Sequence, residues 1–209
     1  MEEVLDVYER PYDPKHPVVG LDEMPVQLLA DVPGREPLPC RPGDVAKVDY
    51  EYTREGTTNV FVAFEPLAGW RHYDVTERRT KLDFARFVRD LVDRRYKNAE
   101  KVVLVMDNLN THTPASLYAA FAPAEAHRIA RKLEIRYTPK HGSWLNVAEI
   151  ELSALARRVD DRTPDQAALA KRAAIVGAER NAAKKGADWQ FITEDARVKL
   201  KRLYPSVEV

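Results

Sequence analysis

The chain has 209 residues, balances 33 basic against 33 acidic side chains and is 44% apolar, which is ordinary for a soluble globular protein of one large or two small domains. Its single cysteine, Cys40, excludes a disulfide framework and any cysteine-based zinc site. No apolar run is long enough to span a membrane, and the acidic start MEEVLDVYERP lacks the apolar centre of a signal peptide. A cytoplasmic location without a membrane partner is therefore expected.

The first part of the chain predicts strands. Prolines keep residues 11–17 extended, and residues 18–23 predict a short buried strand that ends in acids. After a Pro- and Gly-rich loop at 31–44, the alternation of residues 45–53 predicts a half-exposed strand. Further strands are predicted at 58–67 and 70–78. Three consecutive strands with short connections predict an antiparallel meander.

The second part alternates helices with strands. Residues 80–96 carry a helical apolar stripe, and Thr80 and Asp83 are placed like a capping box. Residues 101–107 form a continuous apolar strand of the kind that is buried on both faces and pairs in parallel. Helices at 114–121 and 123–133, a strand at 134–139 and helices at 143–159, 163–185 and 193–204 follow. This order is close to the ribonuclease H-like α/β fold: a mixed central sheet, with antiparallel strands 1–3 plus parallel strands, flanked by helices and completed by C-terminal helices.

Three acids stand at ends of predicted elements. Asp22 closes the first strand, Asp107 closes the long apolar strand, and Glu149 lies in the helix after the last strand. If the apolar strand lies beside the first, Asp22 and Asp107 emerge together, where they repel each other unless a cation separates them. Such hard oxygen donors suit Mg²⁺ or Mn²⁺, and two ions about 3.5–4 Å apart can clamp the attacking and leaving oxygens of a phosphodiester.

Local structure offers a second explanation for each of these polar residues. Acids at strand ends are favoured by turns, and Asp107 could form an Asx turn with the residues from Asn108 to Asn110. His112 could bond to a backbone carbonyl. Taken one at a time, the residues do not decide between a site and a turn.

The helix predicted at 143–159 offers two glutamates. At about 100° per residue, Asn146, Glu149 and Ser153 border its apolar stripe on one side, while Glu151 borders it on the other. Periodicity alone does not choose between them. The amide and hydroxyl beside Glu149 favour that residue as the one that faces a ligand.

Longer motifs carry a resemblance to a known family. The segments VLVMDNLNTHTP and RYTPKHGSWLNVAEIELSALARR closely resemble the catalytic core of bacterial DDE transposases of the insertion sequence 630 family, relatives of the mariner transposases. PVVGLDEMPVQLLAD is similar to the first-aspartate segment of that family, and GTTNVFVAFEPLAGWRHYDVTERRT to its next strands. The likeness runs from residue 4 to residue 205. It implies metal-dependent DNA cleavage at transposon ends and strand transfer into target DNA, with two Mg²⁺ or Mn²⁺ ions.

The resemblance also assigns residues and partners. The metal-binding and catalytic acids fall on Asp22, Asp107 and Glu149. The motif positions expected to orient phosphate or these acids are Asn108, His112, His141 and Asn146. The implied partners are double-stranded DNA, as transposon ends and as target, and a second copy of the chain in a homodimer, near the bacterial nucleoid.

The chain departs from the family at its start. Full-length members carry an N-terminal helix-turn-helix region, whereas MEEVLDVYERPYDP resembles the linker that precedes the catalytic domain. We therefore expect a fragment, or the product of a second reading frame, that works with a helix-turn-helix subunit or a missing N-terminal domain. The expected organisation is a linker at 1–16, a catalytic core at 17–160 and a C-terminal helical extension of the same domain at 161–209.

The C-terminal part is basic although the whole chain is neutral. Residues 157–202 contain 12 Lys or Arg against 7 Asp or Glu. Candidates for contacts with the DNA backbone are Arg157, Arg158, Lys171, Arg172, Lys184 and Lys185; the same charges would equally suit the solvated faces of two helices.

Other functions compete with transposition. The alternatives are a catalytically silent remnant of the same fold that binds DNA or a partner, and a stand-alone nuclease for structured nucleic acid. A small-molecule enzyme is disfavoured because the sequence has no Gly-rich phosphate loop and no nucleophile elbow.

Overall fold

The computed structural model describes residues 1–45, 47–140, 142–159 and 162–204. Its centre is a five-stranded sheet with the order β3-β2-β1-β4-β5. The strands are β1 (Val18–Asp31), β2 (Tyr52–Glu65), β3 (Trp70–Thr76), β4 (Val102–Met106) and β5 (Leu133–Tyr137). β1, β2 and β3 pair antiparallel, and β4 pairs in parallel with both β1 and β5. The predicted mixed sheet of the ribonuclease H-like fold is confirmed.

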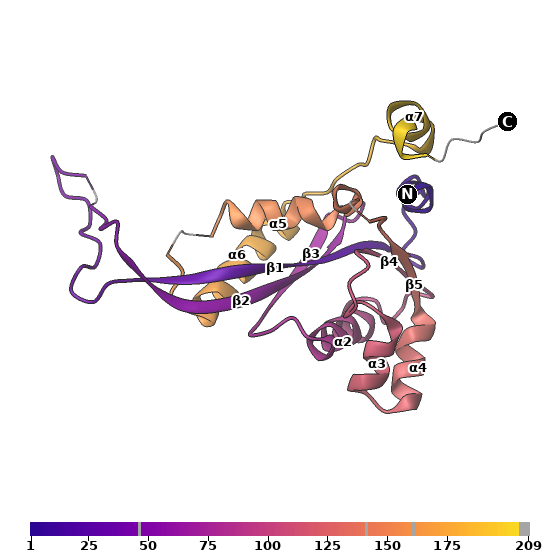
Figure 1. The fold of residues 1–209 in the computed structure, drawn as a ribbon, viewed down its shortest axis with the longest axis horizontal. Helices are drawn as coiled ribbons and strands as arrows, with labels where there is room; N and C mark the ends of the chain where they lie inside the picture. Colours follow the sequence, from indigo (N-terminus) through magenta and orange to yellow (C-terminus); the bar gives the residue numbers. More distant parts are fainter. Residues whose placement is uncertain (46, 141, 160–161, 205–209) are drawn as a thin grey trace.

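Helices cover both faces of the sheet (Figure 1). On one face lie α2 (Lys81–Asp90) with its π-helical continuation η1 (Leu91–Arg95), α3 (Pro114–Ala120) and α4 (Pro123–Lys132); on the other lie α5 (Ala148–Ala156) and α6 (Gln166–Ala182). Because successive side chains of a strand point to opposite faces, each strand supplies both layers. Leu21 and Leu104 pack beneath α2–α4, whereas Val60 and Val62 pack beneath α5 and α6.

Elements from the two ends of the chain meet at one end of the sheet (Figure 1). α1 (Glu2–Tyr8) contacts α7 (Thr193–Lys199), which is followed by the short 3₁₀ turn η3 (Lys201–Leu203). Arg197 Nε donates to Glu2 Oε1 at 2.8 Å, and Tyr8 donates its hydroxyl proton to the Leu145 carbonyl at 2.8 Å. α1 therefore packs on the sheet domain from within the segment expected to be a linker. Throughout the four described ranges, no helix combines the length and apolarity that crossing a membrane requires.

β1 and β2 are longer than their sequence predicts and form a projecting hairpin (Figure 1). The expected end of β1 at residue 23 is wrong, because the strand runs on to Asp31. Pro25 is tolerated there because β1 pairs with β4 only over Val18–Gly20, so its outer edge needs no N–H donor beyond that point. The expected strand at 45–53 is also wrong in its first part: β2 begins at Tyr52, and alternating Val48 and Tyr50 are 59% and 85% exposed, with no face to bury.

Helix ends follow local side-chain chemistry. The capping box at Thr80 is confirmed: Thr80 Oγ1 accepts from the Asp83 N–H, and Asp83 Oδ2 accepts from the Thr80 N–H at 2.8 Å. The helix expected from residue 163 begins instead at Gln166, because the side chain of Asp165 caps it by accepting from the Ala168 N–H at 2.7 Å. The helix expected at 143–159 is divided into the 3₁₀ turn η2 (Ser143–Leu145) and α5.

Candidate active site

Asp22 and Asp107 leave the sheet at one point, between β1 and β4. The parallel pairing matches Gly20 with Val105, so a continuation of this register by two residues sets Asp22 beside Asp107. Asp107 directly follows β4, as predicted. The prediction that Asp22 closes β1 is wrong. Asp22 lies at the point where β1 no longer pairs with β4 and continues paired with β2 alone.

A buried amide seats the start of α5 against β1. The side chain of Asn146 donates from Nδ2 to the Leu21 carbonyl at 2.9 Å, and its Oδ1 accepts from the Ala148 N–H at 3.2 Å. A Cβ on Gly20 would lie 2.7 Å from Val147 Cγ1 and 2.9 Å from the Ala148 nitrogen, so only glycine permits this approach. Glu149, in the first turn of α5, is thereby held exposed above β1.

The electrostatics of Asp22 show that the predicted acids are neighbours. Burial raises the pKa of the Asp22 carboxyl to about 7. The Glu23 N–H, which donates to Asp22 Oδ1 at 2.8 Å, opposes this rise, while the negative charges of Glu149, Glu23 and Asp107 add to it. The repulsion that the neighbouring acids exert on the Asp22 carboxylate favours a bound cation.

His112 joins Asp107 to a further acid. Its Nδ1 is 2.6 Å from Asp107 Oδ1, and its Nε2 is 3.0 Å from Glu23 Oε2. Burial alone would lower the pKa of His112, but the two carboxylates raise it to about 9. The imidazole therefore carries a positive charge near neutral pH and bridges the two acids, rather than bonding to a backbone carbonyl.

Sequence reasoning missed Glu23. Strand alternation directs it to the face opposite Asp22, and its side chain is only 2% exposed among the apolar residues beneath α2. Besides His112, it faces Arg79, whose Nη1 is 3.6 Å from Glu23 Oε1. The available signal was the pair of adjacent acids in LDE, because neighbouring side chains of a strand point to opposite faces of the sheet and the two acids must therefore have different surroundings.

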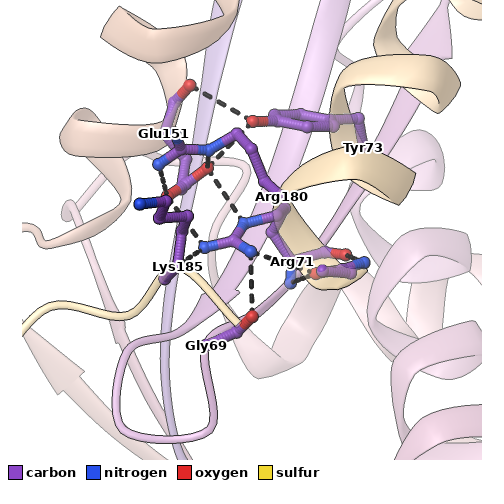
Figure 2. Close-up of polar contacts among 7 residues, drawn as sticks. Gly69, Arg71, Tyr73, Glu151, Arg180 and Lys185 are labelled. Atoms are coloured by element: carbon purple, nitrogen blue, oxygen red, sulfur yellow. Dashed lines mark hydrogen bonds and ion pairs between the residues drawn. The ribbon is translucent and has the colours of Figure 1, made fainter. Parts of the chain in front are cut away.

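Glu151 belongs to a buried ionic network away from the acids (Figure 2). Its carboxylate accepts from Arg71 Nε at 3.0 Å and from Arg180 Nη2 at 2.8 Å, and the Tyr73 hydroxyl donates to it at 3.1 Å. Arg71 also donates to the carbonyls of Gly69 and Lys185. Of the two candidate glutamates, Glu149 is therefore the accessible one, and Glu151 ties α5 to β3 and α6.

The remaining predicted residues are less closely tied to the acids. Asn108 is exposed directly after Asp107, and His141 lies outside the described residues. The predicted DNA-backbone residues Arg157, Arg158, Lys171, Arg172, Lys184 and Lys185 are all exposed. Arg158 Nη2 is 2.5 Å from Glu179 Oε2, so part of its charge is already paired.

Comparison with known proteins assigns the family. A family model described as "DDE superfamily endonuclease" matches residues 17–170, which is well over half of the chain and includes Asp22, Asp107 and Glu149. The chain belongs to the DDE superfamily endonucleases. Among solved structures, this DDE endonuclease domain is similar to a chain in the "Crystal structure of the Mos1 Strand Transfer Complex", with 13% identity and a TM-score of 0.49. The match covers 90% of this chain and 60% of that chain. Comparison with curated proteins gives no significant match.

The donor chemistry of the DDE endonuclease domain fits a hard divalent cation. Asp22, Asp107 and Glu149 offer only carboxylate oxygens, the ligands that Mg²⁺ and Mn²⁺ prefer. In the described portions of the chain, no three His, Cys, Asp or Glu side chains already stand close enough to hold a single metal ion. Asp22, Asp107 and Glu149 are therefore neighbours in the fold, but their carboxylate groups are not close enough together to share one ion.

Proposed function

We propose that this DDE endonuclease domain is the catalytic part of a transposase of the insertion sequence 630 family. It would cleave DNA at transposon ends and join the freed strand to target DNA. The observation that carries the proposal is the grouping of the acids: Asp22 lies in register with Asp107, and the charge of Glu149 acts on Asp22. In this reading residues 17–160 are the catalytic core, and residues 161–209 extend it.

The acids would supply the reactive centre. Asp22, Asp107 and Glu149 would hold two Mg²⁺ or Mn²⁺ ions, which supply activation of the attacking oxygen and stabilisation of the leaving oxygen at the scissile phosphodiester. The exposed side of Asp107, whose side chain is 34% exposed, leaves room for a phosphate to approach. Asn146 keeps Glu149 over β1 through its bonds to Leu21 and Ala148.

Double-stranded DNA is the proposed partner, bound by a homodimer that is completed by a helix-turn-helix subunit or domain. α6 lies on the same face of the sheet as α5 (Figure 1), and its Lys171 and Arg172 are exposed. Phosphate contacts of this kind place the duplex without reading its sequence. Each lost contact should reduce the salt dependence of DNA binding by about one unit of the log–log slope.

The test is cleavage of a plasmid that carries the inverted repeats flanking the gene, with Mn²⁺ or Mg²⁺. Asp107→Asn and Glu149→Gln should each lower the cleavage rate by roughly 100-fold or more, because the metal-held oxygens carry most of the rate enhancement. The matched control is Glu125→Gln, an acid on α4 at the opposite face of the sheet, which should cleave like the unaltered chain. Full activity of Asp107→Asn would refute the assignment, and a chain that stays inactive even with the helix-turn-helix subunit or domain supplied would favour the silent remnant.

A further inference from the structure

We propose that Glu23 is a positioning residue, which acts through His112 to hold the Asp107 carboxylate in the orientation that a divalent cation requires. This inference rests on the proposed function, since it concerns the same acids. It concerns a residue that faces away from Asp22 and that would not itself touch the ion.

Two short contacts link Asp107 to His112 and His112 to Glu23 in the interior. Asp107 Oδ1 lies 2.6 Å from His112 Nδ1, and His112 Nε2 lies 3.0 Å from Glu23 Oε2. The side chains of His112 and Glu23 are 1% and 2% exposed, whereas that of Asp107 is 34% exposed. The series therefore runs from a solvent-facing carboxylate to a fixed interior one.

Asp107 needs such support because its backbone position does little to restrain the orientation of its side chain. It is the first residue after β4, so the sheet no longer restrains its side chain, and several χ1 rotamers are open to a short acid there. The bond from His112 selects the rotamer and occupies one oxygen. The other oxygen is left for a ligand, on a side chain that is 34% exposed.

His112 can support Asp107 only if its ring is itself fixed. Its backbone is held at both groups: the N–H donates to the Leu109 carbonyl at 2.9 Å, and its carbonyl accepts from the Tyr137 hydroxyl at 2.7 Å. The ring packs against Phe84, with 4.8 Å between ring centroids. Phe84 restrains the ring from one side without fixing its rotation. The contact of Nε2 with Glu23 sets that rotation.

The strand arrangement explains why Glu23 can do this. β1 carries Asp22 to the α5 face and Glu23 to the α2 face, so one strand presents an acid at the reactive centre and another behind it. Outer partners of this kind fix the geometry of metal ligands, and their loss typically costs about 10–100-fold in metal affinity. Here the outer partner of Asp107 is His112, and His112 is in turn paired with Glu23 through an ion-pair contact of 3.0 Å.

The test is a double-mutant cycle on Mn²⁺ affinity, measured by calorimetric titration of the full chain without DNA. Glu23→Met keeps the side-chain length and removes the carboxylate, and His112→Phe keeps a ring and removes both nitrogens. We expect each to weaken Mn²⁺ binding about tenfold. The double variant should bind no more weakly than His112→Phe alone, because Glu23 acts only through the imidazole.

Controls separate the possible failures. Glu65→Met removes another buried strand glutamate, whose carboxylate accepts from Arg95 and Tyr96, and it should leave Mn²⁺ affinity unchanged even if it destabilises the fold. If Glu23→Met does not fold, Glu23→Gln replaces it in the cycle, with an expected loss of about threefold from the weaker uncharged acceptor. Unchanged affinity in the Glu23 variant, or losses that multiply in the double variant, would overturn the inference. Asp107→Asn, titrated alongside, tests the metal site itself, and its normal binding of Mn²⁺ would overturn the proposed function as well.

Discussion

Neutralising Glu151 should destabilise the protein strongly. The carboxylate is fully buried and accepts from two guanidinium groups, Arg71 and Arg180, and from the Tyr73 hydroxyl (Figure 2). Glu151→Gln keeps the shape but turns an amide N–H₂ toward cationic donors. Arg71, whose side chain is 0% exposed, then loses its counter-charge in the interior.

Breaking a buried ion pair by removing one partner costs about 3–5 kcal/mol. With a urea m-value of about 2–3 kcal/mol per M, the unfolding midpoint should fall by about 1–2.5 M at pH 7.5. Glu149→Gln, two residues earlier and exposed, should change the free energy of unfolding by less than about 0.5 kcal/mol. A midpoint for Glu151→Gln within about 0.3 M of the unaltered chain would refute the structural role of the network.

The difference in free energy of unfolding between the unaltered chain and Glu151→Gln should depend on pH, and the sign of this dependence follows from the pKa of Glu151. Burial opposes ionisation of Glu151, but the hydrogen bonds from Arg180 and Arg71 outweigh it and lower its pKa below the ordinary value of 4.5. A lowered folded-state pKa contributes stability above the unfolded pKa, and this contribution is lost as the pH falls through the folded value. The gap between the unaltered chain and Glu151→Gln should therefore be constant from neutral pH to about pH 5.5 and shrink below pH 4.5.

Three further substitutions test single contacts, each by urea unfolding. Gly20→Ala should cost about 1–3 kcal/mol and also abolish cleavage, because its methyl group would displace the start of α5; unchanged cleavage would contradict this placement. Tyr8→Phe leaves the Leu145 carbonyl and the Val147 N–H without their partner and should cost about 1–3 kcal/mol, whereas a neutral effect would mean that water replaces the hydroxyl. Thr80→Ala should cost about 1 kcal/mol through the lost cap of α2, with Thr80→Ser as the variant that restores it.

Features set by neighbours in the sequence were predictable. The cap at Thr80 and the apolar stripe of α5, with Leu152 and Leu155 buried, depend on spacings of three or four residues. The continuous apolar character of β4 likewise predicted a central parallel strand. These features gave the order of the elements and therefore the fold class.

Features set by distant partners were not predictable. Whether Glu149 or Glu151 faces outward depends on Arg71 and Arg180, which lie 80 and 29 residues from Glu151 along the chain. The length of β1 depends on its pairing with β2, not on the acids that suggested an end at residue 23. Glu23 was not predicted because its partner, His112, lies 89 residues later in the chain, in the loop that follows β4.

α1 can pack in its final position only after a much later part of the chain has been synthesised. The Tyr8 hydroxyl bonds to Leu145 and Val147, which are 137 and 139 residues later in the chain. At translation rates of about 5–20 residues per second, the ribosome needs roughly 7–30 seconds to make these partners after Tyr8 has been added. During that interval the apolar side of α1 has no partner to pack against, so α1 is a candidate site for chaperone binding on the nascent chain.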